Sequence, residues 1–296
     1  MQTKRVLLVD AFTDEPLAGN AAGVVPDAAD LTEEQMQAIA RELSVSETAF
    51  LLPSDAADRR VRYFTPTTEV DLCGHATVAS HAFLHEDGVV EPGTHTLETE
   101  VGVLDVEIAE DGTVWMSQDR PRVDRVATDP ERVADALGID EVALIDDLPL
   151  AVASTGLPFL LVPVTFLEAL GDADPDPAAI AGLCEDVDAT GVYAFTFDTL
   201  ERDSTLHGRA FVPLAGIDED PVTGTASGAA GAYLRHTDAL DSLADELRFE
   251  QGHFVDRPGV VRVRVGTDVE VGGAAVTAFD GDLSVPDADD DEIIEA

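Results

Sequence analysis

Two helix-like segments built from small residues constrain the possible folds of this chain most strongly. They span Gly74–Glu86 and Gly224–His236, and each one opens with a glycine. The second reads GTASGAAGAYLRH. A helix with this much glycine gains little from intrinsic propensity, so close packing on all sides has to hold it. The first is nearly apolar over its first turns, which predicts a buried helix.

The surroundings of the two segments also match. The first opening reads CGHAT after VDL, and the second reads TGTAS after DPV. We interpret this as an internal duplication of one α+β unit. The polar stretch 119–129 marks the boundary, and we expect a site in the cleft between the halves. The N-terminal lobe then spans residues 1–122 and the C-terminal lobe residues 123–273.

The remaining pattern predicts strands and amphipathic helices around these two segments. A helix is expected over residues 31–43, where Thr32 and Gln35 can form a capping box, and another over residues 130–137. Strands are expected at residues 6–9, 48–52, 61–64, 96–108, 114–117, 160–164, 191–197, 206–213 and 260–265.

Acidic residues dominate the composition of this 296-residue chain. It has 60 Asp and Glu against 17 Lys and Arg, which gives a formal charge of −43. Such a field repels phosphate backbones and anionic lipids, so we expect no nucleic-acid and no membrane partner. The acids are scattered from end to end, which favours adaptation to high salt, where the Debye length is ~3 Å near 1 M. An ordinary acidic protein is the alternative.

Other compositional features bear on location. Hydrophobic residues make up 45% of the chain, yet no apolar run reaches the ~18 residues of a membrane helix, so we expect a globular protein. The N-terminal MQTKRVLLVDAF lacks a long apolar stretch, which predicts no signal peptide and a cytoplasmic location. Cys73 and Cys184 are too few for a disulfide framework or a zinc site. The acidic end, VPDADDDEIIEA, is expected to fray.

The two glycine openings are candidate anion-binding sites. A helix N-terminus leaves unpaired N–H groups and carries the positive end of the helix dipole. Gly74 and Gly224 would let a ligand approach the backbone closely, and two such openings facing one cleft could bind a carboxylate or an oxyanion. The alternative is that both glycines only permit tight helix packing.

Three side chains near these openings could perform acid–base chemistry. Glu47 lies where a helix meets an apolar strand, and poor solvation there would raise its pKa toward that of a general acid or base at neutral pH. His75 lies in the first turn of its helix, where the dipole favours the neutral ring. Asp220 precedes the second opening and could cap its turn or supply a second carboxylate. An exposed loop glutamate and a structural histidine are the alternatives.

The motifs of other enzyme classes are absent from the sequence. It contains no GxGxxG, GxSxG, GxxxxGK[ST], HExxH or CxxC pattern. This removes the usual support for dinucleotide, serine-hydrolase, P-loop and zinc chemistry. We therefore expect proton transfer without a cofactor and without a metal.

A set of short motifs runs along nearly the whole chain. It begins with DAF at residues 10–12, Gly19-Asn20, SETAF at 46–50 and RYFTP at 62–66. It continues with EVDLCGHAT at 69–77, DEDPVTG at 218–224, Gln251-Gly252 and Arg257-Pro258. In its order and spacing this set resembles the PhzF family of phenazine-biosynthesis-like isomerases, whose fold is that of diaminopimelate epimerase.

The resemblance implies an α+β fold of two pseudo-symmetric lobes, each a mixed sheet wrapped around a central helix. A strand near residues 274–284 is then expected to return to the first lobe. The resemblance also implies a homodimer and a site without a cofactor. Its functional residues fall on Glu47 as the catalytic group, on the supporting His75 and Asp220, and on the substrate-binding Gly74, Gly224, Thr225 and Asn20.

This sequence departs from the family pattern in three places. Thr225 stands where serine is usual, Ala21 where proline is common, and Asp256 where glycine is common. Thr225 keeps a hydroxyl, so we expect the chemistry to survive. We expect these three departures to affect which substrate the protein accepts.

We hypothesise an isomerase that moves a proton within a small carboxylate substrate, with Glu47 as the general acid/base. One alternative is a two-base amino-acid racemase or epimerase, which uses a cysteine before each glycine. Cys73 fills the first of these positions, but Thr223 occupies the second. Another alternative is a non-catalytic small-molecule-binding protein on the same fold.

Overall fold

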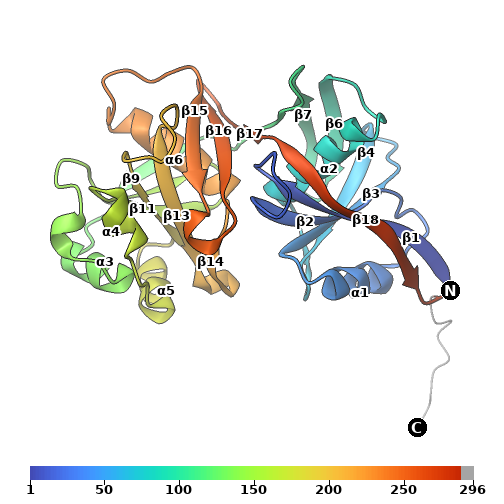
Figure 1. The fold of residues 1–296 in the computed structure, drawn as a ribbon, viewed down its shortest axis with the longest axis horizontal. Coiled ribbons are helices and arrows are strands. Elements are labelled where there is room, and N and C mark those ends of the chain that lie inside the picture. The colour runs from blue at the N-terminus through green and yellow to red at the C-terminus, as the bar shows by residue number, and fades with distance from the viewer. Residues whose placement is uncertain (288–296) are drawn as a thin grey trace, which may run out of the picture.

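The chain folds into two lobes that lie side by side along the long axis of the molecule (Figure 1). The computed structural model describes residues 1–287. The acidic end that the sequence predicts to fray lies, from residue 288 onward, outside the described residues. Dividing the chain after residues 122 and 273 remains our proposal for the limits of the lobes.

The N-terminal lobe contains two helices and eight of the strands. Its elements are β1 (Gln2–Ala11), β2 (Asn20–Val25), α1 (Glu33–Leu43), β3 (Glu47–Leu52), β4 (Arg59–Phe64), β5 (Glu69–Val70), α2 (Gly74–Glu86), β6 (Gly93–Thr99), β7 (Gly102–Ile108) and β8 (Val114–Ser117).

The C-terminal lobe is built from the next stretch of chain. Its elements are β9 (Arg122–Arg125), α3 (Pro130–Leu137), η1 (Glu141–Ala143), β10 (Ala151–Ser154), β11 (Pro158–Pro163), α4 (Leu167–Gly171), α5 (Pro177–Asp186), β12 (Gly191–Thr196), β13 (Leu206–Val212), η2 (Pro213–Ala215), β14 (Ile217–Asp220), α6 (Gly224–His236), β15 (Leu247–Gln251), η3 (His253–Val255), β16 (Gly259–Val265) and β17 (Val269–Gly273). The last strand of the described chain is β18 (Ala275–Val285).

Both lobes use one strand-pairing scheme. In the first lobe β1 is antiparallel to β2, β2 is parallel to β3, β3 is antiparallel to β4, and β4 is parallel to β6. The corresponding strands of the second lobe, β10, β11, β12, β13 and β15, repeat this order of antiparallel, parallel, antiparallel and parallel pairs. The internal duplication and the pseudo-symmetric α+β lobes expected from the sequence are therefore confirmed.

Two strand pairs tie the lobes together. β18 leaves the C-terminal lobe and pairs antiparallel with β1 along its whole length, from Gln2↔Val285 to Ala11↔Ala275. β17 of the C-terminal lobe pairs antiparallel with β8 of the N-terminal lobe. All eighteen strands of residues 1–287 are thus joined in one mixed sheet system.

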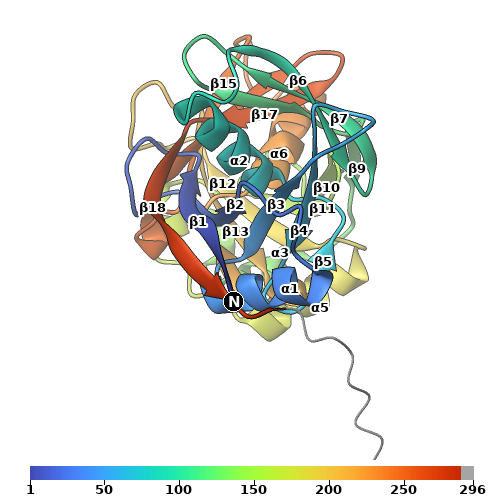
Figure 2. The same cartoon turned by 90° about the vertical axis from the view of Figure 1, so that its right-hand side faces the viewer.

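Each lobe encloses one small-residue helix. α2 contacts β1, β2, β3, β7, β8 and β18, and α6 contacts β9, β10, β11, β16 and β17. Nine consecutive residues are buried in each helix, from Ala76 to Leu84 in α2 and from Ala226 to Leu234 in α6. Figure 2 shows α2 and α6 near the centre of the molecule, surrounded by strands. The two helices also approach each other directly.

Local sequence signals determine where several elements begin or turn. α1 begins after Thr32, whose hydroxyl accepts from the Gln35 N–H while the Gln35 side chain accepts from the Thr32 N–H, so the predicted capping box is confirmed. The single strand predicted over residues 96–108 is wrong. It is a hairpin of β6 and β7 in which Thr99 pairs with Gly102. Gly102 has a φ of +122°, a conformation that favours glycine and lets the chain reverse there.

None of the helices among the described residues combines the length and the apolarity needed to cross a membrane.

Replacing glycine in α6 tests how tightly the sheet wraps its helix. A Cβ at Gly231 would lie 2.8 Å from Val263 Cγ1 and 2.9 Å from Val265 Cγ2, so we expect Gly231→Ala to destabilise the fold by about 1–3 kcal/mol through overpacking. The matched control is Gly182→Ala in α5, where the nearest atom lies 3.8 Å away and the better helix former should stabilise by up to about 1 kcal/mol. Urea unfolding measures both, and equal effects would contradict this packing.

Candidate active site

Glu47 and His75 meet at the edge of the N-terminal lobe. Glu47 is the first residue of β3, and it pairs with Ala22 of the parallel strand β2. His75 is the second residue of α2. Nε2 of His75 lies 3.5 Å from Oε2 of Glu47, with 12% and 20% of the two side chains exposed. Oγ of Ser46 lies 3.3 Å from the same ring nitrogen. A carboxylate and an imidazole are thus held together in a largely desolvated place.

Cys73 packs beneath this pair. Its Sγ lies 3.4 Å from Nδ1 and 4.0 Å from Nε2 of His75. The two nitrogens flank one carbon of the imidazole, so the sulfur lies close to that side of the ring. Burial, and secondarily the negative charge of Glu47, raises the pKa of the Cys73 thiol well above its usual value. The thiol is therefore neutral at neutral pH, as a small buried side chain.

Asp220 brings a second carboxyl group from the C-terminal lobe. It ends β14, accepts a 2.9 Å hydrogen bond from Nδ2 of Asn20, and accepts another from the Thr223 hydroxyl. Burial raises the pKa of Asp220, which the Thr223 hydrogen bond and the charge of His75 lower and the charge of Glu47 raises. The acid–base groups of the two lobes therefore lie within electrostatic reach of each other.

Gln251 braces the turn between Asp220 and α6. Its side-chain carbonyl accepts from the Thr223 N–H at 3.1 Å, and its amide nitrogen donates to the Asp220 backbone carbonyl at 2.8 Å. The same nitrogen lies 3.1 Å from Oγ1 of Thr223. Gln251 itself is 1% exposed. These hydrogen bonds fix the orientation in which the Thr223 hydroxyl meets the Asp220 carboxyl.

The two helix openings share one backbone geometry. Cys73 and Thr223 precede α2 and α6 in extended conformations, and neither side chain caps its helix. The first-turn N–H groups consequently have no side-chain cap, as an anion-binding helix end requires. Thr225 occupies in α6 the second position that His75 occupies in α2.

The surroundings of the two glycines differ. A Cβ at Gly74 would meet no atom within 4 Å, whereas a Cβ at Gly224 would lie 3.1 Å from Cζ of Phe12. Phe12 comes from the N-terminal lobe and is 1% exposed. The opening at Gly74 is thus free for a ligand to approach. On the side that faces Phe12, Gly224 permits tight packing, which is the alternative role considered for both glycines in the sequence analysis.

The site could in principle hold a cation. One ligand atom from each of Glu47, Cys73 and His75 lies within 4.8 Å of the others. A thiol must lose its proton to bind a metal, however, and the raised pKa of Cys73 opposes that. The absence of a metal and of a cofactor remains a prediction. Four surface cavities among the described residues, of about 300 to 670 Å³, are lined by other residues.

The two duplicated α+β lobes, each wrapped around a buried small-residue helix, define the diaminopimelate epimerase-like fold. The fold is shared with the hydroxyproline epimerase from Agrobacterium vitis at a TM-score of 0.60 and 14% identity, over 96% of this chain and 91% of that chain. The expected fold class is confirmed.

Closer relatives define the family. The family model of phenazine biosynthesis-like proteins (PhzC-PhzF) matches residues 9–281. The uncharacterized isomerase YfhB of Bacillus subtilis is 42% identical over 280 residues, which cover 92% of this chain and 93% of the relative. The crystal structure of a PhzF-family protein from Bacillus anthracis has a TM-score of 0.90 and 35% identity, over 96% of this chain and 100% of that chain. The chain belongs to the PhzC-PhzF family and is an isomerase.

The structure brings several of the predicted site residues together, along with neighbours that had no role in the sequence analysis. Glu47, His75 and Asp220 come together, and Asn20 reaches Asp220 from the other lobe. Thr223 and Gln251 also contact Asp220, although the sequence argument assigned neither to the site. The signal was present in the motif at residues 218–224, where Thr223 lies three residues after Asp220, and in Gln251-Gly252, although Gln251 lies 31 residues from Asp220 in the chain.

The raised pKa of Asp220 gives a pH test. The folded state holds the Asp220 proton to higher pH than the unfolded chain, where an aspartate titrates near ~3.9. The stabilisation is full below that value and is lost as the pH rises through the folded-state pKa. We therefore expect the free energy of unfolding of wild type, minus that of Asp220→Asn, to fall as the pH rises from about 4.

Chemical unfolding at high salt, from acid to neutral pH, measures this difference. The matched variant Asp218→Asn removes one exposed carboxyl and thereby corrects for the change in net charge. A difference that stayed constant or rose with pH would show that Asp220 is ionised at no extra cost in the folded state.

Proposed function

We propose that this isomerase moves a proton within a small unsaturated or α-acidic carboxylate, without a cofactor, and that Glu47 is its general acid/base. Glu47 removes a proton from a carbon next to the carboxylate or along its π-system. The electron pair passes to the carboxyl oxygens, and protonated Glu47 returns the proton to another carbon of the same system. One carboxyl group suffices when the proton leaves and returns on the same face.

One observation carries this proposal. Oε2 of Glu47 lies 3.5 Å from Nε2 of His75 at the uncapped opening of α2, and the charge of this carboxylate affects the pKa of Asp220 across the lobes. A ring N–H that donates to the carboxylate would hold Glu47 ready to accept a proton from carbon.

The remaining residues would bind the substrate and stabilise its charge. The open backbone at Gly74, and the amides of α6 beginning at Gly224, would bind carboxylate or enolate oxygens, because developing negative charge is stabilised by fixed N–H donors. Asp220 keeps a proton to higher pH than an exposed aspartate, so it could donate to a substrate oxygen. Thr225 and Asn20 would complete the polar wall of the site.

Replacing Glu47 tests the role of the acid/base. The assay is deuterium incorporation from solvent into a panel of vinylacetate, unsaturated dicarboxylates, alanine and proline. We expect Glu47→Gln to lower the rate by about 10²–10⁴-fold, the usual contribution of a positioned acid/base, while the ligand still binds. Glu42→Gln, at the exposed end of α1, is the matched control. Wild-type exchange in the E47Q variant would remove Glu47 from its assigned role.

Replacing Cys73 separates this chemistry from two-base racemisation. The racemase alternative needs a thiolate before each glycine, but burial keeps the Cys73 thiol neutral and Thr223 fills the equivalent position. We expect Cys73→Ala to retain deuterium incorporation within about tenfold of wild type, because the side chain contributes packing rather than a proton. A loss as deep as that of the E47Q variant would favour the thiol mechanism.

We also propose that the protein is a homodimer and that it works in the cytoplasm. The scattered acidic residues further support a protein adapted to high salt. These proposals rest on the family resemblance and the composition, and light scattering across a salt series tests the dimer and the salt requirement together.

A further inference from the structure

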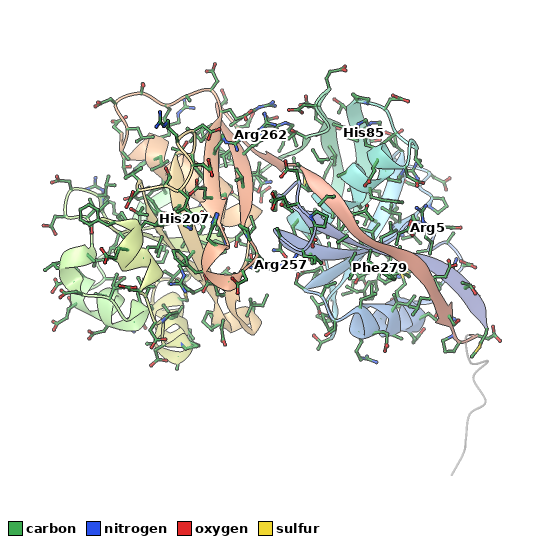
Figure 3. The ribbon with its side chains drawn as sticks, in the orientation of Figure 1. Arg5, His85, His207, Arg257, Arg262 and Phe279 are labelled. Carbon is green, nitrogen blue, oxygen red and sulfur yellow. The ribbon has the colours of Figure 1, made fainter. Side chains whose placement is uncertain are left out.

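Asp10 and Arg257 form an ion pair between the lobes, although the reaction proposed above gives them no role. Asp10 lies near the end of β1 in the N-terminal lobe, and Arg257 follows η3 in the C-terminal lobe. Nη2 of Arg257 lies 2.5 Å from Oδ1 of Asp10, whose side chain is 3% exposed. Figure 3 shows Arg257 on the side of its lobe that faces the loop between β1 and β2.

Arg257 also binds the backbone of that loop. Its Nη2 donates to the Ala18 carbonyl at 2.6 Å, and its Nε donates to the Gly19 carbonyl at 2.9 Å. The neighbouring Pro258 carbonyl accepts from the Gly19 N–H at 2.9 Å. The second oxygen of Asp10 accepts from the Leu17 N–H at 2.7 Å. The end of this loop is therefore fixed from both lobes.

The residue that follows this loop is Asn20. Its Nδ2 donates to Oδ1 of Asp220 and to the Val222 carbonyl, both at 2.9 Å. Among the described residues, Asn20 is the only residue of the N-terminal lobe whose side chain forms a hydrogen bond with Asp220. Holding Gly19 in place therefore also holds Asn20 in place. Asn20 and Arg257 together connect the loop of one lobe to the acid of the other.

A second connection runs within the C-terminal lobe. Gly252 has a φ of +86°, and a Cβ there would lie 2.1 Å from the Arg257 carbonyl and 2.7 Å from the Pro221 carbonyl. The turn that carries Arg257 thus packs directly against the residue after Asp220. Asp256, where the family pattern favours glycine, has a φ of +56°, which explains that preference because glycine adopts this region without strain.

We propose that Arg257 is a positioning residue that, through Asp10 and the loop at residues 17–19, holds Asn20 and Asp220 in the orientation that proton transfer by Glu47 requires. The inference rests on the proposed function. Arginine suits this task because one planar guanidinium reaches a carboxylate and two backbone carbonyls, whereas lysine presents a single point charge.

Four variants test this inference. Arg257→Gln removes the guanidinium, Arg257→Lys keeps the charge, and Asp10→Asn removes the buried carboxylate. The double variant D10N/R257Q avoids an unpaired buried charge, which by itself can unfold a protein, so it keeps the test valid where R257Q does not fold. The matched control is Arg132→Gln, which breaks an exposed ion pair of 2.6 Å with Asp186 within one lobe.

The kinetic readout uses the panel acid that wild type exchanges fastest. Displacing a catalytic group by about 1 Å can cost about 10²-fold in rate, so we expect kcat to fall 10- to 100-fold in R257Q and in the double variant. We expect KM to change less than threefold, R257K to lie between R257Q and wild type, and R132Q to stay within twofold. A kcat of R257Q or of the double variant within twofold of wild type would overturn the inference.

Amide hydrogen exchange gives a readout that does not depend on a substrate. Loss of Arg257 must loosen the amides of Leu17 and Gly19 in any case, because their acceptors lie beside it. Positioning additionally requires faster exchange, by at least tenfold, at the Thr223 amide, which binds Gln251 on the far side of the Asn20–Asp220 contact. Loosening confined to residues 17–19 would overturn the inference, even if Glu47→Gln kept full activity and the proposed function itself were wrong.

Discussion

The burial of two helices with almost no large side chains on their first turns is the constraint on which the rest of the structure depends. Such helices have little intrinsic stability, and they persist because strands enclose them on nearly all sides. At Gly228 and Gly231 of α6 a Cβ would lie 2.8 Å from its nearest neighbour. Because the strands enclose α2 and α6 so closely, they also position the uncapped N-terminal ends of both helices where the lobes meet. The packing of the two helices therefore determines where the site lies.

The duplicated scaffold carries an unequal site. Position 75 in the first lobe is histidine, whereas the equivalent position 225 is threonine, and position 73 is cysteine whereas position 223 is threonine. The N-terminal lobe thus supplies the imidazole and Glu47, and the C-terminal lobe supplies Asp220, whose pKa is raised by burial. Because each lobe contributes a different group, the contacts that set the lobes against each other also set the chemistry.

Local and non-local information account for what the sequence could predict. The capping box at Thr32 and the two small-residue helices are encoded within a few residues, and they were predicted. The hairpin at Gly102 was missed because alternating residues continue through its short turn and resemble one long strand. The Asp10–Arg257 ion pair joins residues 247 positions apart. The pKa of Asp220 is raised mainly by burial and is further affected by His75 and Glu47 of the other lobe. No local sequence pattern predicts such contacts. The family motifs include the residues involved but do not show which of them pair.

The asymmetry also bears on the stereochemical course of the reaction. A two-base racemase needs one proton-transfer group on each face of the substrate, one from each lobe. Glu47 is the first residue of β3, whereas β12, the corresponding strand of the second lobe, spans Gly191–Thr196 and contains no carboxyl, imidazole or thiol side chain. The thiol position is likewise kept only in the first lobe, where burial holds Cys73 neutral. Asp220 is the carboxyl of the second lobe, and it keeps its proton to higher pH than an exposed aspartate. In the reaction proposed above it is therefore a proton donor rather than a second base, and Glu47 would remove and return the proton on one face.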